Sequence, residues 1–472
     1  MNGTSPRANA HNCSGPITRR TALKFGALGL GGLTLGDVFR LQAQAGTAAA
    51  HDDRAVIFIW LPGGPPHMEM YDLKPDAPSE YRGEFRPIRT NVSGVEVGEL
   101  LPLHAKCADK FNIIRSLSHK FADHGGGHKR FMMAREPKEP TGTVNDHPAV
   151  ASMIAKVVEG RQRGLPNYVA GMDAGRQGID TFAFGSAYLG SSTEPFSVPG
   201  DPSSPKFTVE NLAPLAGLDS RVKLLRQLDK WGGAAEKSGA FDSLDQFNRR
   251  AVELVTSGKA QAAFDLSKEP EALKDRYGRH AYGARCLLAR RLVEAGCTFV
   301  TMVLENPMPG KDLPNYVSYN WDSHAVNCHI FNDAKVRLPL YDQAVTALIE
   351  DLYQRGLDRR VLLFVTGEFG RTPRLSYSVG TASHVMQPGR DHWPNAMSMI
   401  VSGGGMRTGQ VIGATNSKGE FPTERPLTPN DLWATVLQHL GIDPQRAFND
   451  FAGRPVPILP FGDPIRELLP TG

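Results

Sequence analysis

Five short apolar runs divide the chain, and each ends at a glycine, a proline or a charged residue. Runs of this length that are rich in β-branched and aromatic residues predict buried strands. The predicted strands are AVIFIWL (55–61), FNIIRSLSH (111–119), TFVTMVL (298–304), RVLLFVT (360–366) and MSMIVSGGG (397–405). None of these runs is long enough to cross a bilayer.

Amphipathic segments alternate with the later runs and predict helices. Residues 283–296 and 428–441 both have helical spacing of apolar positions and a final glycine. Thr428 and Pro429 supply an N-cap and a first-turn proline for the second of them. A further helical stripe consists of Tyr341, Val345, Leu348 and Leu352.

Helices that alternate with buried strands predict the fold class. We expect an α/β fold with a mostly parallel central sheet, flanked by helices on both faces. Residues 170–265 differ because they are polar, rich in loops and largely helical in pattern. We therefore predict a single domain over 46–472, with an inserted polar helical lobe at about 170–265.

The amino terminus has the pattern of an export signal. Arg19 and Arg20 stand in TRRTALKF (18–25), before the apolar run GALGLGGLTLG and the small residues AQA at 43–45. This order resembles a twin-arginine signal peptide over residues 1–45. It predicts the twin-arginine export machinery as a partner and a periplasmic or extracellular location.

The charge of the chain is concentrated in that segment. The whole sequence has 53 basic and 49 acidic residues, of which five basic and one acidic lie in 1–45. The remainder therefore holds 48 of each and is neutral. A neutral mature chain gives no reason to expect nucleic acid as a partner.

Carboxylates and imidazoles follow the predicted strands. In open parallel sheets, ligands bind beyond the carboxyl ends of the strands, so these positions should converge. The candidates after the first two strands are His67, Glu69, Asp72, Asp123, His124 and His128. Those after the later strands are Asp322, His324, Glu368, Asp391 and His392.

This mixture of oxygen and imidazole donors predicts one or two divalent metal ions, with zinc, manganese and calcium all compatible. Two nearby ions can stabilise both the attacking and the leaving oxygen of a phosphoryl-type transfer. Arg371 and Arg390 are expected to clamp the anionic group of a substrate.

Each of these residues also has a purely structural interpretation. A single Asp-x-His is more often a surface pair or a helix cap than a metal site. Arg390 and Asp391 can form an ion pair with His392 and Trp393 packed beneath it. His67 can simply close a turn.

The whole chain resembles a family of twin-arginine-exported proteins known as uncharacterised-domain family number 1501 (DUF1501). The matching stretches are WLPGGPPHMEMYDLKPDAP, RGEFRPI, ADKFNIIRSLSH, FDLSKEP, LLARRLVEAG, GEFGRTP, GRDHWP and GIDPQRAF. This family looks like a branch of the alkaline phosphatase and sulfatase superfamily. The resemblance implies a three-layer sandwich with a metal site at the strand ends.

The resemblance also implies a set of metal ligands. Glu368 stands where the superfamily has an aspartate after a central strand, and His392 with Asp391 resembles its later histidine. Asp322 and His324 resemble an aspartate and a histidine from a preceding loop. The segment from His67 through Glu69 to Asp72 takes the place of the first-strand aspartate.

The chain departs from the superfamily at the nucleophile. No serine, threonine or cysteine occupies 121–133, and the sulfatase signature C-x-P-S-R is absent. We therefore expect a sulfatase-like hydrolase of phosphate or sulfate esters in which a metal-bound water attacks, with His124 or His128 as base. The alternatives are a catalytically silent protein that binds an anionic ligand or polysaccharide, and a structural envelope protein.

Overall fold

The computed structural model describes residues 53–161, 164–178, 181–209 and 258–469. The predicted signal peptide lies outside these residues. An eight-stranded sheet forms the centre, in the order β14-β4-β13-β8-β1-β7-β5-β6. The strands, in that order, are Val411–Ile412, Phe111–Leu117, Met397–Gly403, Val361–Thr366, Ala55–Trp60, Phe299–Val303, Tyr168–Met172 and Phe196–Pro199.

Strand β13 is the one exception to a parallel sheet. It pairs antiparallel with both β4 and β8, while the other neighbours pair parallel. The start of β13 therefore lies at the same edge as the ends of β4 and β8. Asp391 and His392 reach this edge at the entrance to a strand and not at an exit, which corrects the sequence-based expectation.

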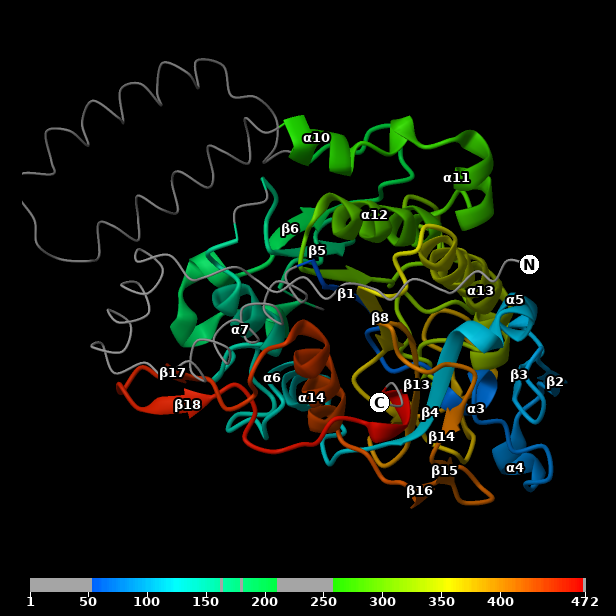
Figure 1. Cartoon of the computed structure of the whole chain (residues 1–472). Coiled ribbons are helices and arrows are strands. Elements are labelled where there is room, and N and C mark those ends of the chain that lie inside the picture. The colour runs from blue at the N-terminus through cyan, green and yellow to red at the C-terminus, as the bar shows by residue number, and fades with distance from the viewer. Residues whose placement is uncertain (1–52, 162–163, 179–180, 210–257, 470–472) are drawn as a thin grey trace, which may run out of the picture. The chain divides into compact units, whose positions relative to one another are not determined.

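Alternate residues of the strands pack into separate cores on the two sheet faces. In β1, Ile57 and Ile59 belong to one core, and Phe58 and Trp60 belong to the other. Helices α12 (Ala281–Ala295) and α13 (Ile330–Gln354) cover the first face. Helices α6 (His124–Met133), α7 (Val150–Val157) and α14 (Pro429–Leu440) cover the second (Figure 1). The predicted three-layer α/β architecture is confirmed.

The boundaries of α14 follow from its sequence. The backbone N–H of Thr428 donates to Asp431 Oδ2 over 2.8 Å, which forms half of a capping box. Gly441 ends the helix with φ 69°, a left-handed conformation that glycine adopts without strain.

The predicted lobe at 170–265 is wrong in its first part. Strands β5 and β6 pair with each other and extend the main sheet beyond β7. They were missed because they are short, and Gly171 interrupts the apolar run of β5. At the other end, α10 (Gly258–Phe264) packs against α12 and buries Ala260 and Phe264 in the first core. Residues 210–257 lie outside the described part.

Smaller elements surround the sheet. These are α3 (His67–Met70), α4 (Ser79–Arg82), α5 (Pro102–Lys106), α11 (Glu271–Tyr277) and the two-stranded pairs β2–β3, β9–β12, β10–β11, β15–β16 and β17–β18. The strands of these pairs are β2 (Pro87–Arg89) with β3 (Glu96–Gly98), β9 (Gly370–Arg371) with β12 (His392–Trp393), β10 (Ser376–Val379) with β11 (Met386–Gly389), β15 (Ala414–Thr415) with β16 (Pro422–Glu424), and β17 (Ala447–Asn449) with β18 (Pro455–Pro457). Cys107, Cys286, Cys297 and Cys328 are buried. No helix in the described ranges is long and apolar enough to cross a membrane.

Candidate metal centre

Imidazoles and carboxylates meet at the sheet edge where β4 and β8 end and β13 begins. Helix α6 follows β4, and its N-cap Asp123 accepts a hydrogen bond from the Gly126 N–H over 2.7 Å. Starting the helix there places His124 and His128 on one face, because they are four residues apart. Glu368 follows β8 directly.

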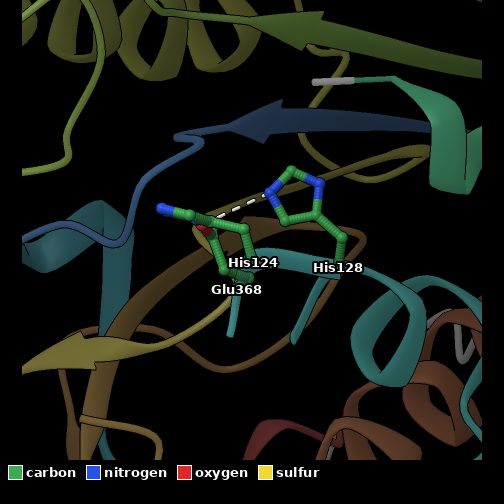
Figure 2. A group of neighbouring side chains, drawn as sticks. All are labelled: His124, His128 and Glu368. Atoms are coloured by element: carbon green, nitrogen blue, oxygen red, sulfur yellow. Dashed lines mark hydrogen bonds and ion pairs between the residues drawn. The ribbon is translucent and has the colours of Figure 1, made fainter. Parts of the chain in front are cut away.

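The first group contains His124, His128 and Glu368, drawn together in Figure 2. Glu368 Oε1 lies 2.8 Å from His124 Nδ1 and 3.3 Å from His128 Nε2. The same oxygen accepts the Gly63 N–H over 2.8 Å. Glu368 Oε2 and His128 Nδ1 are buried and have no hydrogen-bond partner among the described residues. A buried polar atom without a partner is costly, so this group is incomplete as it stands.

The turn after β1 explains why glycine is needed beside this group. Gly63 has φ 104°, and a Cβ there would lie 2.5 Å from the backbone nitrogen of Asp322. The PGG sequence therefore allows the first-strand turn to approach both Glu368 and the loop that carries Asp322.

The second group lies on the other side of His124. Asp322 Oδ1 is 3.1 Å from His324 Nε2 and 3.1 Å from His392 Nε2. The two Nε2 atoms are 2.9 Å apart. His124 Nε2 approaches Asp322 Oδ2 to 3.5 Å, so this histidine contacts both groups.

Hydrogen bonds on the far side of the two imidazoles fix their tautomers. His392 Nδ1 lies 2.6 Å from the Ala122 carbonyl oxygen, which can only accept, so Nδ1 carries the proton. His324 Nδ1 donates in the same way to Asp391 Oδ1 over 2.7 Å. When both rings are neutral, both Nε2 lone pairs therefore point at each other and at the Asp322 carboxylate. Three electron-pair donors this close require a proton or a cation between them.

Burial and charge shift the pKa values of the centre. Burial alone would lower the pKa of His124, but hydrogen bonds to Asp322 and Glu368, with their negative charge, raise it to about 10. Burial would raise the pKa values of Asp322 and Glu368, but the surrounding histidines hold both well below their usual range. Burial lowers the pKa of His392 and favours its neutral, metal-ligating form.

The spacing of the donor atoms approaches that of a divalent metal site. Bonds of about 2.0–2.2 Å in a tetrahedral site place neighbouring ligand atoms roughly 3.3–3.6 Å apart. Asp322 Oδ1 and the Nε2 atoms of His324 and His392 are 2.9–3.1 Å apart, so these three atoms would separate slightly to hold an ion. Second partners of this kind, Asp391 and the Ala122 carbonyl, orient metal-ligating histidines in many proteins. The centre can be reached from solvent, since the His124 side chain is 39% exposed.

The first-strand residues do not join this centre. His67, Glu69 and Asp72 are buried, and neither group of potential metal ligands among the described residues contains them. Asp72 contacts Lys74 at 2.9 Å and Thr415 at 2.5 Å. One turn of helix, α3, carries His67 and Glu69 into the core, and Asp72 follows just after it, instead of continuing along the sheet edge.

The two arginines are also buried and bonded to the protein. Arg390 donates to Glu69 Oε1 through Nε and Nη2 at 3.0 and 2.8 Å, and its other N–H groups meet backbone carbonyls. Arg371 donates to Asp322 Oδ1 over 2.6 Å and to the carbonyl of Gly64 over 3.0 Å. Both therefore position other residues, which differs from the substrate clamp that we expected.

Of the predicted residues, the structure brings together Asp322, His324, Glu368, Asp391 and His392, with His124 and His128. The two histidines of α6 were expected as bases, yet their atoms lie among the potential ligands. The i, i+4 spacing of these histidines, which places them on one helix face, was the sequence feature that could have identified them as ligands. The backbone N–H of Gly63 was missed, because a main-chain donor leaves no trace in residue type.

A family model described as "Protein of unknown function (DUF1501)" matches residues 53–469. No curated protein matches the chain. Similar solved structures include the phosphonate monoester hydrolase SpPMH from Silicibacter pomeroyi, with 13% identity, a TM-score of 0.37 and coverage of 88% of this chain and 76% of that one.

Two further structures are similar at the same level. Ps i-CgsB in complex with k-i-k-neocarrahexaose has 10% identity, a TM-score of 0.35 and coverage of 83% and 72%. A mutant of TAB5 alkaline phosphatase with Mg bound has 10% identity, a TM-score of 0.33 and coverage of 82% and 98%. Likeness this low says nothing about what this chain does.

Proposed function

We propose that this chain, which belongs to the DUF1501 family, is an exported metal-dependent hydrolase of phosphate or sulfate esters. One observation carries the proposal: Asp322 Oδ1 and the Nε2 atoms of His324 and His392 approach one another to 2.9–3.1 Å. Such a triangle of donors suits zinc or manganese. Export rests on the twin-arginine pattern at 18–25.

Asp322, His324 and His392 would hold the ion. Its positive charge would stabilise the negative charge that develops on the ester oxygens. Asp391 orients His324 from behind, and Arg371 fixes the Asp322 carboxylate from the buried side. His128 and Glu368 could hold a second ion. The number of bound ions decides between one metal site and two.

His124 is the residue best placed to move a proton. It is 39% exposed, whereas His128 is 2% exposed and cannot reach a bound substrate. Glu368 holds His124 Nδ1 at 2.8 Å and so orients the ring. In the metal-free protein, hydrogen bonds to Asp322 and Glu368 raise the pKa of His124 to about 10. We assign His124 to proton exchange with the attacking water or the leaving oxygen of the ester.

A second candidate function has one observation in its favour. The stretch 121–133 lacks a hydroxyl or thiol that could form a covalent intermediate. A protein that retains the metal ligands but binds an anionic ligand, such as a sulfated polysaccharide, without turnover would need none.

Hydrolysis of phosphate and sulfate esters, before and after removal of metal by a chelator, tests the proposal. Activity should disappear with the metal and return with one of zinc, manganese or calcium. His124→Gln should keep the metal but hydrolyse at least about a hundredfold more slowly, while the exposed His384→Ala serves as the matched control. Metal binding without hydrolysis of either ester class would instead support the silent binding protein.

A further inference from the structure

The hairpin formed by β10 (Ser376–Val379) and β11 (Met386–Gly389) carries a concentration of exposed apolar side chains. Twelve large hydrophobic side chains are exposed among the described residues, and four of them lie here. They are Tyr377 (63% exposed), Val379 (53%), Val385 (59%) and Met386 (65%). Isolated apolar residues are ordinary on a surface, whereas a contiguous group indicates a binding surface.

This hairpin exposes its apolar face and buries its polar face, which is the reverse of most surface hairpins. Val379 is opposite Met386, so their side chains share a face, and Tyr377 shares it two residues away. Ser378 and Gln387 form the other face, and Gln387 is buried. An antiparallel pair normally turns its apolar face toward the core. Here the apolar face points away from the protein.

Hydrogen bonds to a neighbouring loop hold the hairpin in this orientation. Gln387 Nε2 donates to the Ala325 carbonyl over 2.8 Å, and the Thr381 N–H donates to the Val326 carbonyl over 2.9 Å. Val326, in that loop, is itself 43% exposed. The outer side chains therefore remain in solvent and are not folded back onto the core.

The hairpin continues directly from the metal centre. Strands β9 (Gly370–Arg371) and β12 (His392–Trp393) pair at its base, with Arg371 opposite His392. A surface that receives the apolar face would therefore lie beside the residues proposed to hold the metal.

The hairpin itself carries one exposed arginine and no acidic residue, while the exposed Glu80 and Asp391 adjoin its base. No aspartate or glutamate occurs in 369–390, and Arg374 and His384 are exposed. The neighbouring carboxylate residues belong to the base of the hairpin, where Thr372 N–H bonds the Asp391 carbonyl and Leu375 N–H bonds the Glu80 carbonyl, both over 2.8 Å.

We propose that the β10–β11 hairpin docks onto a lipid bilayer with anionic headgroups. The apolar side chains would enter the interface, and Arg374 would meet the headgroup phosphates. Their exposed area is on the order of 400 Å², about half of the ~800 Å² per partner in stable protein complexes. The area is thus small for a protein interface but sufficient for a few side chains inserted among lipids. This proposal does not depend on the metal centre.

Flotation with lipid vesicles tests it, using the purified, metal-loaded protein with phosphatidylcholine alone or mixed with phosphatidylglycerol. The protein should float with the mixed vesicles. Val379→Asp/Met386→Asp should reduce the bound fraction by more than about tenfold. Val144→Asp, at a residue that is 80% exposed in another loop, is the matched control and should bind normally. Arg374→Gln should weaken binding to the mixed vesicles several-fold.

Metal content and ester hydrolysis of a soluble substrate, measured on the same samples, separate this test from that of the proposed function. Both should be unchanged in the double variant. Absence of binding by the unmodified protein, or equal binding by the double variant, would overturn the proposal. A concentration-dependent dimer that the double variant abolishes would overturn it too, because a second copy would then cover the hairpin.

Discussion

Two clusters of the same residue types lie close to the sheet edge, and they differ in how their polar atoms are paired. The α3 cluster, His67, Glu69 and Asp72, is buried, and each residue has a protein partner. The metal centre is partly exposed, and its donors face one another. The difference shows that residue type and position after a strand do not define a metal site. What distinguishes the metal centre is that the Nε2 atoms of His324 and His392 face each other with no donor between them among the described residues, although Arg371 and His124 pair with Asp322.

Arg390 supplies the positive charge that neutralises the α3 cluster from within the protein. Its guanidinium neutralises Glu69 within the core, and the remaining donors meet carbonyl groups. Among the described residues, no comparable cation enters between His324 and His392. Removal of one partner should therefore destabilise the fold in the first cluster and reduce metal binding in the second.

The largest effect is expected from Glu69→Ala, which leaves the buried charge of Arg390 without a partner. The free energy of unfolding should fall by about 3–5 kcal/mol. Metal content of the folded fraction should be unchanged. Denaturant titration and elemental analysis measure the two quantities, and loss of metal at unchanged stability would place Glu69 in the metal centre.

The pH dependence of stability should report on His67, another member of the α3 cluster. Burial lowers the pKa of His67 to about 4, with a smaller opposing contribution from the charge of Asp72. The unfolded chain therefore binds more protons between about pH 4 and 6.5, and stability falls as pH drops through this window. The contribution lost is about 3 kcal/mol. Above pH 6.5 it is fully present.

Burial also lowers the pKa values of His119, His147, His280 and His392, so His67→Gln should remove only part of this acid-dependent loss. Urea titrations at several pH values provide the comparison. An unchanged pH profile in His67→Gln would mean that His67 is not a buried neutral histidine.

Asp322→Ala should, unlike Glu69→Ala, reduce metal binding. Asp322 contacts three histidines, so its loss should weaken metal binding by about a hundredfold or more. The metal-free protein should also lose stability, because Asp322 is the carboxylate partner of the buried Arg371, so affinity is compared on the folded fraction. Calorimetric metal titration gives the affinity, with Asp358→Ala on a loop before β8 as a carboxylate control. Equal affinity in Asp322→Ala would remove it from the ligand set.

A smaller effect is expected for Asp391→Asn, since Asp391 acts through His324. Loss of the carboxylate that accepts from His324 Nδ1 should weaken metal binding by about 10–100-fold. Restoration by Asp391→Glu would support an orienting role. An effect as large as that of Asp322→Ala would instead indicate direct coordination.

The sequence was sufficient for most of the fold, because long apolar runs such as 55–61 and 360–366 report burial directly. It failed at β5 and β6, where the runs are short and Gly171 contributes no apolar side chain. It also gave no direction for β13, since antiparallel and parallel buried strands have similar composition.

The candidate site was predictable in part. Glu368 and His392 follow from strand ends and from the family resemblance. The position of α3 does not follow from the sequence, because the turn at Gly63 brings a backbone N–H, and not the side chain of His67, to Glu368. Nor could the sequence show that Arg390 would find Glu69, which lies 321 positions away.

The most direct test of the central claim is elemental analysis of the purified protein beside Asp391→Ala/His392→Ala, with folding of both checked by circular dichroism. The account predicts about one to two equivalents of divalent metal in the unmodified protein and loss of metal bound at Asp322 and His324 in the folded variant. Absence of metal from both proteins, even after incubation with zinc, manganese or calcium, would contradict it and leave the cluster as a structural contact between loops.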